Sequence, residues 1–233
     1  QMFMACDSSD IEYRYADLRV DLDREVDRFT NAGSVWTLTA ILKFIIRVGQ
    51  HRPLSGPSTG SSFIPTPKSL MMKHAIVNVY NPDDNLCFVW AVLSAIHPCE
   101  RHNERVSKYR SFLNTIDLSG LKFPVAVNQV SRFEKNNPDI SVNVYAFVEE
   151  GLEIIPKYVT RCCRREKHVD LMLLSSETSD NCHYVWIKNM SALVRQSSKL
   201  KYKVHVCPHG VNPFSSKRSF ENHFSDCSKH RYQ

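Results

Sequence analysis

Residues 82–98 read PDDNLCFVWAVLSAIHP, and this stretch decides the fold. Turn-forming residues open it and a proline closes it. Residues 87–96 are almost all apolar, which predicts a helix that is buried on every side. With an N-cap at Asp84 or Asn85, this helix carries Cys87 in its first turn. Backbone N–H groups and the helix dipole favour a thiolate at such a position, so Cys87 is a candidate nucleophile.

A cysteine on an apolar helix often serves packing alone, but a second stretch favours catalysis. Residues 168–174 and 182–187 are two mainly apolar runs around a polar loop, which predicts two strands. His183 then lies at the start of the second strand. A thiol nucleophile needs a base within hydrogen-bond reach, and the order of a helix-start cysteine and a downstream strand-start histidine is papain-like.

The chain of 233 residues can bury one good core and carry a small appendage. Its composition, 42% hydrophobic and 23% charged, is ordinary for a globular protein. We expect three segments: an N-terminal extension with a Pro/Gly/Ser-rich connector over residues 1–66, an α+β domain over 67–198, and a basic tail over 199–233.

Alternating and apolar runs predict a mainly antiparallel sheet beside the Cys87 helix, which is the α+β class. The expected strands are 75–80, a hairpin of 140–147 and 152–156, the two strands around His183, and the second half of 35–48. The expected further helices are 68–73, 100–113 and 127–136.

Charge and cysteine content point to a partner and a compartment. The net charge is +6, and the segment from Lys199 onward holds seven Lys or Arg against two Asp or Glu. This basic tail favours nucleic acid as a partner. The eight cysteines come without a signal peptide or an apolar run of membrane-spanning length. We therefore expect an intracellular protein, nuclear or cytoplasmic, that is neither secreted nor bound to a membrane.

The tail has the spacing of a ββα zinc finger, in which a hairpin and a helix face share the ligands of one ion. The matching positions are Cys207, Phe214, Phe220, His223 and Cys227. The second hairpin ligand should stand at Gly210, which cannot bind a metal. His209 or His205 could complete a tetrahedral zinc site, and the alternative is a finger with three ligands. We take Cys207, His209, His223 and Cys227 as the expected ligands.

A helix starting near Lys217 would direct Ser216, Ser219 and Asn222 outward. One finger covers only about three base pairs, so we do not expect sequence-specific DNA binding from this unit alone. Nearby lysines would contact phosphates instead.

The order of several motifs resembles one family. They are RPLSG (52–56), SSFIP (61–65), DNLCFVWA (84–91) with His97 and Pro98, SVNVY (141–145), HVDL (168–171), HY (183–184) with IKN (187–189), and the terminal finger. The chain resembles, over about residues 30–230, proteins of Maverick/Polinton-type DNA transposons and adinto-like viruses. In these the segment is associated with a protein-primed family B DNA polymerase. No polymerase or exonuclease carboxylate motif is recognisable in this chain.

Two of these blocks resemble ovarian-tumour-type (OTU) cysteine peptidases. Asp84 and Cys87 match an Asp placed three residues before the nucleophile, and His183 begins the matching His-aromatic pair. The usual glycine is Asn85 here, and Val185 replaces a polar residue, so Asn189 is taken as the third catalytic member.

The OTU resemblance implies a thiol peptidase that acts on ubiquitin-like conjugates or on a polyprotein. Backbone N–H groups of residues 84–87 would hold the oxyanion. Two alternatives stay open: an inactive adaptor for nucleic acid or a replication complex, and a decaying element copy.

Overall fold

The computed structural model describes residues 19–20, 23–24, 27, 62–148, 153–161, 165–175, 181–198 and 204–227. The chain divides into two units, Pro53–Arg231 and a second one formed by Gln1–Arg52 with Tyr232–Gln233. The few described residues of that second unit are helical. The strand expected in the second half of 35–48 lies outside the described residues. The features below belong to the first unit.

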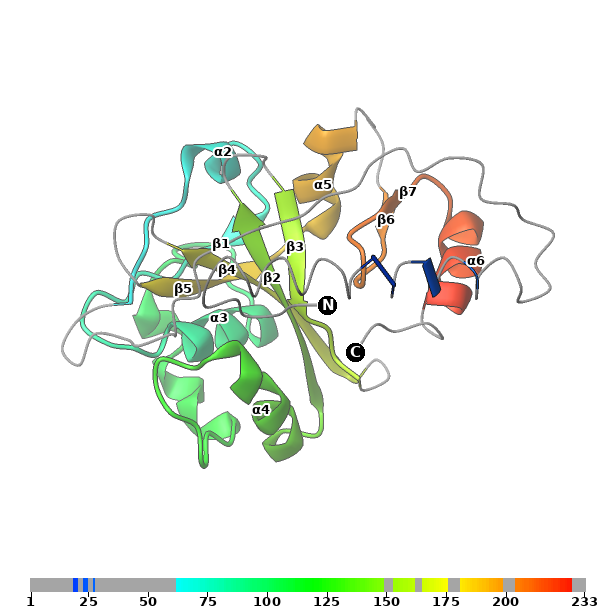
Figure 1. The fold of residues 1–233 in the computed structure, drawn as a ribbon. Helices are drawn as coiled ribbons and strands as arrows, with labels where there is room; N and C mark the ends of the chain where they lie inside the picture. Colours follow the sequence, from blue (N-terminus) through cyan, green and yellow to red (C-terminus); the bar gives the residue numbers. More distant parts are fainter. Residues whose placement is uncertain are drawn as a thin grey trace, which may run out of the picture. The chain divides into compact units, whose positions relative to one another are not determined.

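A five-stranded sheet forms the centre of this unit (Figure 1). The pair β2 and β4 is parallel, and the other neighbours are antiparallel. The α+β class with a mainly antiparallel sheet is therefore confirmed. The strand order is β1 (Ile76–Val77), β5 (Cys182–Ile187), β4 (Lys167–Ser175), β2 (Ile140–Val148) and β3 (Glu153–Tyr158).

Helix α3 (Cys87–Ile96) covers one face of the sheet, as the apolar stretch predicts. Its first eight residues are all buried, and Phe88 and Trp90 are among the largest buried side chains. Successive side chains of a strand point to opposite faces, so Val142 of β2 packs toward α3. Burial of each such large apolar side chain contributes about 1.5–3 kcal/mol before the entropy cost of ordering it.

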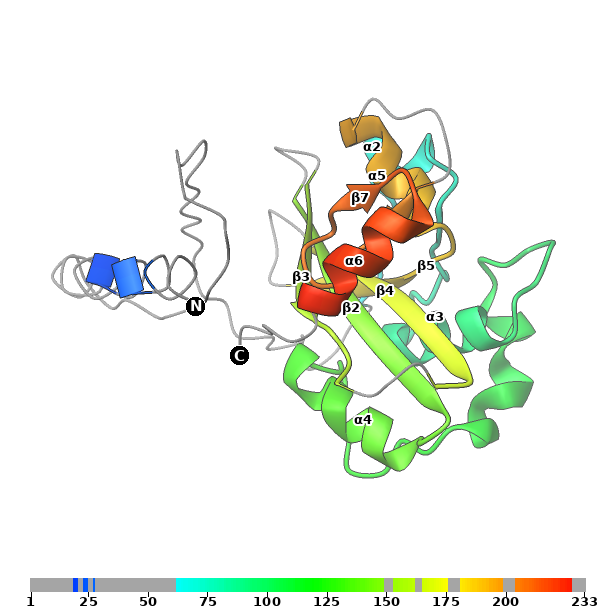
Figure 2. The same cartoon turned by 90° about the vertical axis from the view of Figure 1, so that its right-hand side faces the viewer.

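The opposite face of the sheet carries α5 (Met190–Ser198) and a two-stranded hairpin (Figure 2). In β2, the residues that point to this face are Tyr145 and Phe147, and they follow a register shift between Val144 and Tyr145. Leu193 of α5 and Val211 of the hairpin loop are buried in the same apolar cluster as Tyr145. The hairpin is therefore part of the packed unit, although its residues come last in the sequence.

The segment after α3 differs from the expected exposed helix over 100–113. It forms two 3-10 helices, η1 (Val106–Lys108) and η2 (Arg110–Thr115). Tyr109 lies between them, fully buried, and its hydroxyl donates to the Asn103 carbonyl at 2.7 Å. These tertiary contacts override a sparse helical pattern.

The other expected short helices form close to their predicted places. Residues 68–73 contain α2 (Lys68–Met71), and 127–136 contain η3 (Val127–Gln129) followed by α4 (Val130–Asn136).

The C-terminal segment has a ββα order. Strands β6 (His205–Val206) and β7 (Pro213–Phe214) pair antiparallel, and α6 (Lys217–Cys227) follows. The Ser216 hydroxyl accepts a hydrogen bond from the Ser219 N–H at 3.1 Å, which caps the helix start.

Candidate active site and metal centre

Cys87 is the first residue of α3, and its thiol is almost fully buried. Burial raises the pKa of the thiol. Hydrogen bonds from the Ser62 side chain and from the backbone of Tyr184 and Phe88 act in the opposite direction, and the charge of Asp84 adds to the rise. Burial dominates, so Cys87 rests as a neutral thiol at pH 7.

His183 lies on β5 and is also fully buried. Its Nε2–H donates to Asn78 Oδ1 at 2.7 Å, while Nδ1 makes no hydrogen bond to a described protein atom. The ring of Phe63 packs edge-on against the imidazole, with 5.3 Å between ring centroids. Burial lowers the pKa of His183 from 6.5 to about 4, although the Ser62 backbone and Asp84 act to raise it.

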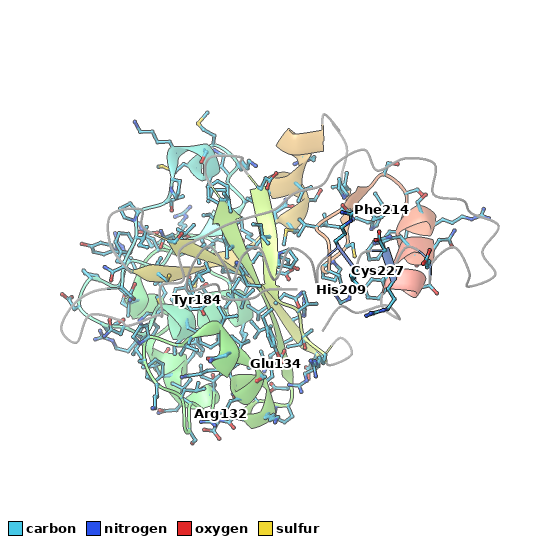
Figure 3. All side chains as sticks on the ribbon, viewed as in Figure 1. Arg132, Glu134, Tyr184, His209, Phe214 and Cys227 are labelled. Atoms are coloured by element: carbon cyan, nitrogen blue, oxygen red, sulfur yellow. The ribbon has the colours of Figure 1, made fainter. Side chains whose placement is uncertain are left out.

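Ser62 and the residue after it lie near these two residues. Its hydroxyl accepts a hydrogen bond from Asn81 Nδ2 at 3.4 Å, and Asn81 also bonds to Asp84 in the loop before Cys87. The next residue, Phe63, packs against the His183 ring. The thiol and the ring do not hydrogen-bond to each other in the described structure. Cys87 and His183 thus come from two elements that pack together, α3 and β5, and the His183 side chain points to the face of β5 that Val185 and Ile187 share (Tyr184, which follows His183, is labelled in Figure 3).

Asp84 organises the loop before α3. Its carboxylate accepts hydrogen bonds from the Trp90 indole at 3.0 Å, from Asn81 Nδ2 at 2.8 Å and from the Leu86 N–H at 2.9 Å. The N-cap position is Leu86, one or two residues later than predicted, because Asp84 holds the N–H just before the helix. Asp84 therefore positions the helix start and the first turn that presents Cys87.

Asn189 does not lie at this site as a partner of His183. Its side-chain oxygen accepts the Ala192 N–H at 3.0 Å and so caps α5. The amide that orients His183 is Asn78, which follows β1. A signal existed in the sequence, since Asn78 is a polar residue between Val77 and Val79 in an expected strand. Nothing in the sequence linked it to His183, because 105 residues separate them.

The buried imidazole predicts an acid-sensitive fold. Between pH 6.5 and about 4 the unfolded chain binds a proton at His183 that the folded chain does not bind. The free energy of unfolding should therefore fall by up to about 3 kcal/mol as the pH drops through this window. Urea unfolding at pH 7, 6, 5 and 4 measures it.

Two variants control this pH series. His183→Gln should flatten the dependence on pH, whereas His102→Asn, at an exposed histidine, should keep the wild-type slope. An unchanged slope in His183→Gln would assign the acid sensitivity to other groups.

Cys207, His223 and Cys227 form a cluster at the C-terminal segment that could hold a metal ion. Their ligand atoms all lie within 4.8 Å of one another, and the two sulfurs are 3.7 Å apart. Zinc–sulfur bonds of about 2.3 Å at a tetrahedral angle place two sulfurs about 3.8 Å apart. The donor set and its spacing therefore fit zinc. Burial and the neighbouring Cys207 thiol raise the pKa of Cys227 to about 11.

His209 and His205 do not belong to this three-residue cluster. The His209 ring stacks on Phe224 with 6.0 Å between centroids, and the His205 ring stacks on Phe220 at 5.9 Å. His209 Nε2 is buried and makes no hydrogen bond to a described protein atom, as is also true of Nε2 of the cluster member His223. The role of His209 as fourth ligand stays a prediction (His209 and Cys227 are labelled in Figure 3).

The exposed residues of α6 include charges of both signs, Lys217, Arg218 and Glu221. Ser219 and Asn222 are exposed as predicted, but the exposed Lys217 pairs with Glu221 at 3.5 Å. Nucleic-acid binding by the basic tail stays a prediction, because residues 199–203 and 228–233 lie outside the described chain.

A polar network fills the far side of the sheet, where two of the family-like motifs fall. Ser141 Oγ lies 2.8 Å from His168 Nδ1, and Asn143 Nδ2 donates to Asp170 at 3.0 Å. This order of serine, histidine and aspartate looks catalytic in sequence. Ser141 is fully buried, however, and its hydroxyl is used by His168, so the network joins β2 to β4.

Comparison with known proteins identified no relative: no protein-family model, no curated protein and no solved structure matches the chain. Among the described residues, no helix has both the length and the apolar character needed to cross a membrane.

Proposed function

We propose that this protein is a thiol peptidase in which Cys87 is the nucleophile, His183 is the base and Asn78 orients the base. One observation carries the proposal: His183 donates Nε2–H to Asn78, its Nδ1 makes no hydrogen bond to a described protein atom, and its strand packs against the helix that begins with Cys87. A base needs one nitrogen fixed by an acceptor and the other one ready to take a proton.

The chemistry follows from these roles. Nδ1 of His183 takes the thiol proton, and the sulfur attacks the carbonyl carbon of a peptide or isopeptide bond. The imidazolium then returns the proton to the leaving nitrogen as the C–N bond breaks, which leaves a thioester on Cys87. Water, deprotonated by His183, attacks the thioester and releases the acid and the thiol.

Two classes of substrate agree with the resemblance to OTU-type peptidases: ubiquitin-like conjugates and a polyprotein of a Maverick/Polinton-type element. Both present an extended chain that ends in an acyl group at the thiol. The proposal for the site does not depend on which of the two is cleaved.

Labelling with ubiquitin that carries a C-terminal electrophile tests the proposal. We expect a covalent adduct that forms slowly on the buried Cys87 of the wild type and none in Cys87→Ser or His183→Gln, with circular dichroism confirming that each variant folds. An adduct that forms equally well in His183→Gln would refute the role of the base. If only a small electrophile labels Cys87, and does so with dependence on His183, the substrate is a different peptide.

An inactive adaptor is the second candidate function, and one observation favours it. Cys87 and His183 are both buried, and no hydrogen bond joins them. In that case the C-terminal segment with its Cys207, His223 and Cys227 cluster would bind a nucleic acid or a replication partner. Absence of any His183-dependent adduct, together with salt-dependent binding to single- or double-stranded DNA, would support the adaptor.

A further inference from the structure

The segment of residues 62–66, which we call the strap, contacts two residues of the candidate active site, His183 and Asn78. Ser62 is only 3% exposed. It belongs to the part of the sequence that was expected to be a connector, yet its hydroxyl accepts a hydrogen bond from Asn81 in the loop that leads to the Cys87 thiol. The residue after it packs on the His183 imidazole. A substrate of a thiol peptidase must place its acyl group at the same two partners.

The next residue of the strap fills a position beside the base. The ring of Phe63 packs against His183 and also against Tyr80, with 4.8 Å between the two centroids in the second contact. Tyr80 remains 55% exposed, so this aromatic contact lies at the edge of the buried site. An apolar side chain is thus held next to the imidazole, and water is excluded from that side of the ring.

Asn78 holds the strap and the base with opposite ends of one amide. Its Nδ2 donates to the Ile64 carbonyl at 2.9 Å and to the Thr66 hydroxyl at 3.0 Å, while its Oδ1 accepts from His183. The Ile64 contact is made to the backbone, which any extended peptide can offer.

We infer that the strap occupies the substrate channel of this site, and that the channel takes an extended peptide with a large apolar residue in the place of Phe63. This inference rests on the proposed function for its chemistry. The strap contributes to the resting state of the base, because Phe63 packs on His183 and burial keeps this imidazole neutral. Displacement of the strap would expose the thiol and admit a substrate chain.

The test measures how fast iodoacetamide modifies each cysteine at pH 7.5, by peptide mapping. Half-buried Cys99 serves as an internal reference in every sample. In the wild type we expect Cys87 to react more slowly than Cys99. Phe63→Ala and Thr66→Val should each raise the Cys87 rate by on the order of 10-fold, because an exposed thiol ionises and reacts more readily. Thr115→Val, at an exposed threonine outside the strap, should leave it unchanged.

A peptide added in trans tests the class of ligand. A blocked peptide with the sequence of residues 62–66 should slow Cys87 modification in Phe63→Ala, and the same peptide with alanine in place of phenylalanine should protect less. Fast Cys87 modification in the wild type, unchanged rates in both strap variants, or equal protection by the two peptides would each overturn the inference.

The double variant Phe63→Ala/His183→Gln separates the two proposals. If Cys87 in this double variant is modified as fast at pH 7.5 as in Phe63→Ala, the strap covers the thiol but His183 does not activate it. The inference then stands and the proposed function fails. If wild-type Cys87 already reacts quickly and needs His183, the proposed function stands and the inference fails.

Discussion

Asn78→Asp is expected to activate Cys87. Aspartate keeps the oxygen that accepts Nε2–H of His183 but loses the two N–H donors that hold Ile64 and Thr66. Its negative charge also favours the imidazolium form and so raises the pKa of His183 toward neutrality. The strap should loosen while the base stays oriented. We expect Cys87 modification by iodoacetamide at pH 7 to rise by about 10³-fold, about 10-fold from exposure of the thiol and about 10²-fold from the general base, since a thiolate is the reacting species.

Asn78→Ala should leave Cys87 exposed but without an oriented base, so its modification rate should be low at pH 7 and rise with pH. It frees the strap in the same way, but it leaves Nε2–H of His183 without its acceptor, so the ring loses its fixed orientation. Cys87 should then be accessible yet unactivated, with a rate that increases with pH up to the ordinary thiol range. At pH 7 the rate should be on the order of 10²-fold below that of Asn78→Asp, the size of a typical general-base contribution.

Asn189→Ala decides between the two amides considered for the third catalytic role. It removes the cap of α5 and should cost about 1 kcal/mol of stability. The Cys87 rate should stay at the wild-type value. Equal rates in Asn78→Asp and Asn78→Ala at every pH would contradict the assignment of Asn78, because a residue that only holds the strap would act alike in both.

The sequence predicts those parts of this fold that depend on local patterns. The nearly all-apolar composition of α3 predicts that this helix is buried in the core. Two apolar runs around a polar loop predict strands β4 and β5. Cys87 and His183 could be selected because each sits at the start of an element. The helix predicted for residues 100–113 was wrong, because Tyr109 is buried in the core by tertiary contacts that the spacing of apolar residues does not reveal.

Partners of these residues could not be predicted in the same way. Asn78 reaches His183 only through the pairing of β1 with β5, and Ser62 reaches Asn81, in the loop before Cys87, only through the path of the strap. A serine in a Pro/Gly/Ser-rich stretch looks like a linker residue, and its 3% exposure results from tertiary packing alone. Residues at the ends of helices and strands can be predicted from the sequence, whereas contacts between side chains that are distant in the sequence cannot.

The C-terminal cluster shows the same division. The spacing of Cys207, His223 and Cys227 follows from one hairpin and one helix face, and the structure brings them together as predicted. The fourth ligand depends on how the His205 and His209 rings pack, and spacing along the chain does not determine that. Three described side chains are close enough to share one ion, and His209 as the fourth ligand stays a prediction.

Gly210→Cys is expected to tighten zinc binding strongly, because cysteine would supply the hairpin ligand that the spacing places there. A Cβ at Gly210 meets only the end of the exposed Asn212 side chain, at 2.9 Å, so a side chain can be accommodated. Even loss of an outer-shell partner changes metal affinity by about 10–100-fold, so a new direct ligand should lower the Kd by about 100-fold or more. Competition with a chromophoric chelator on the full chain measures this Kd.

Two further variants serve as controls for the zinc Kd of Gly210→Cys. Gly210→Ala introduces the same Cβ without a ligand and should keep the wild-type Kd. Cys207→Ser removes one of three ligands and should abolish stoichiometric zinc, and it should also lower the thermal stability of the ββα segment, since metal affinity in such small units is folding free energy. If Gly210→Cys and Gly210→Ala bind zinc equally, position 210 does not face the ion, and the three described ligands hold it with a partner from elsewhere.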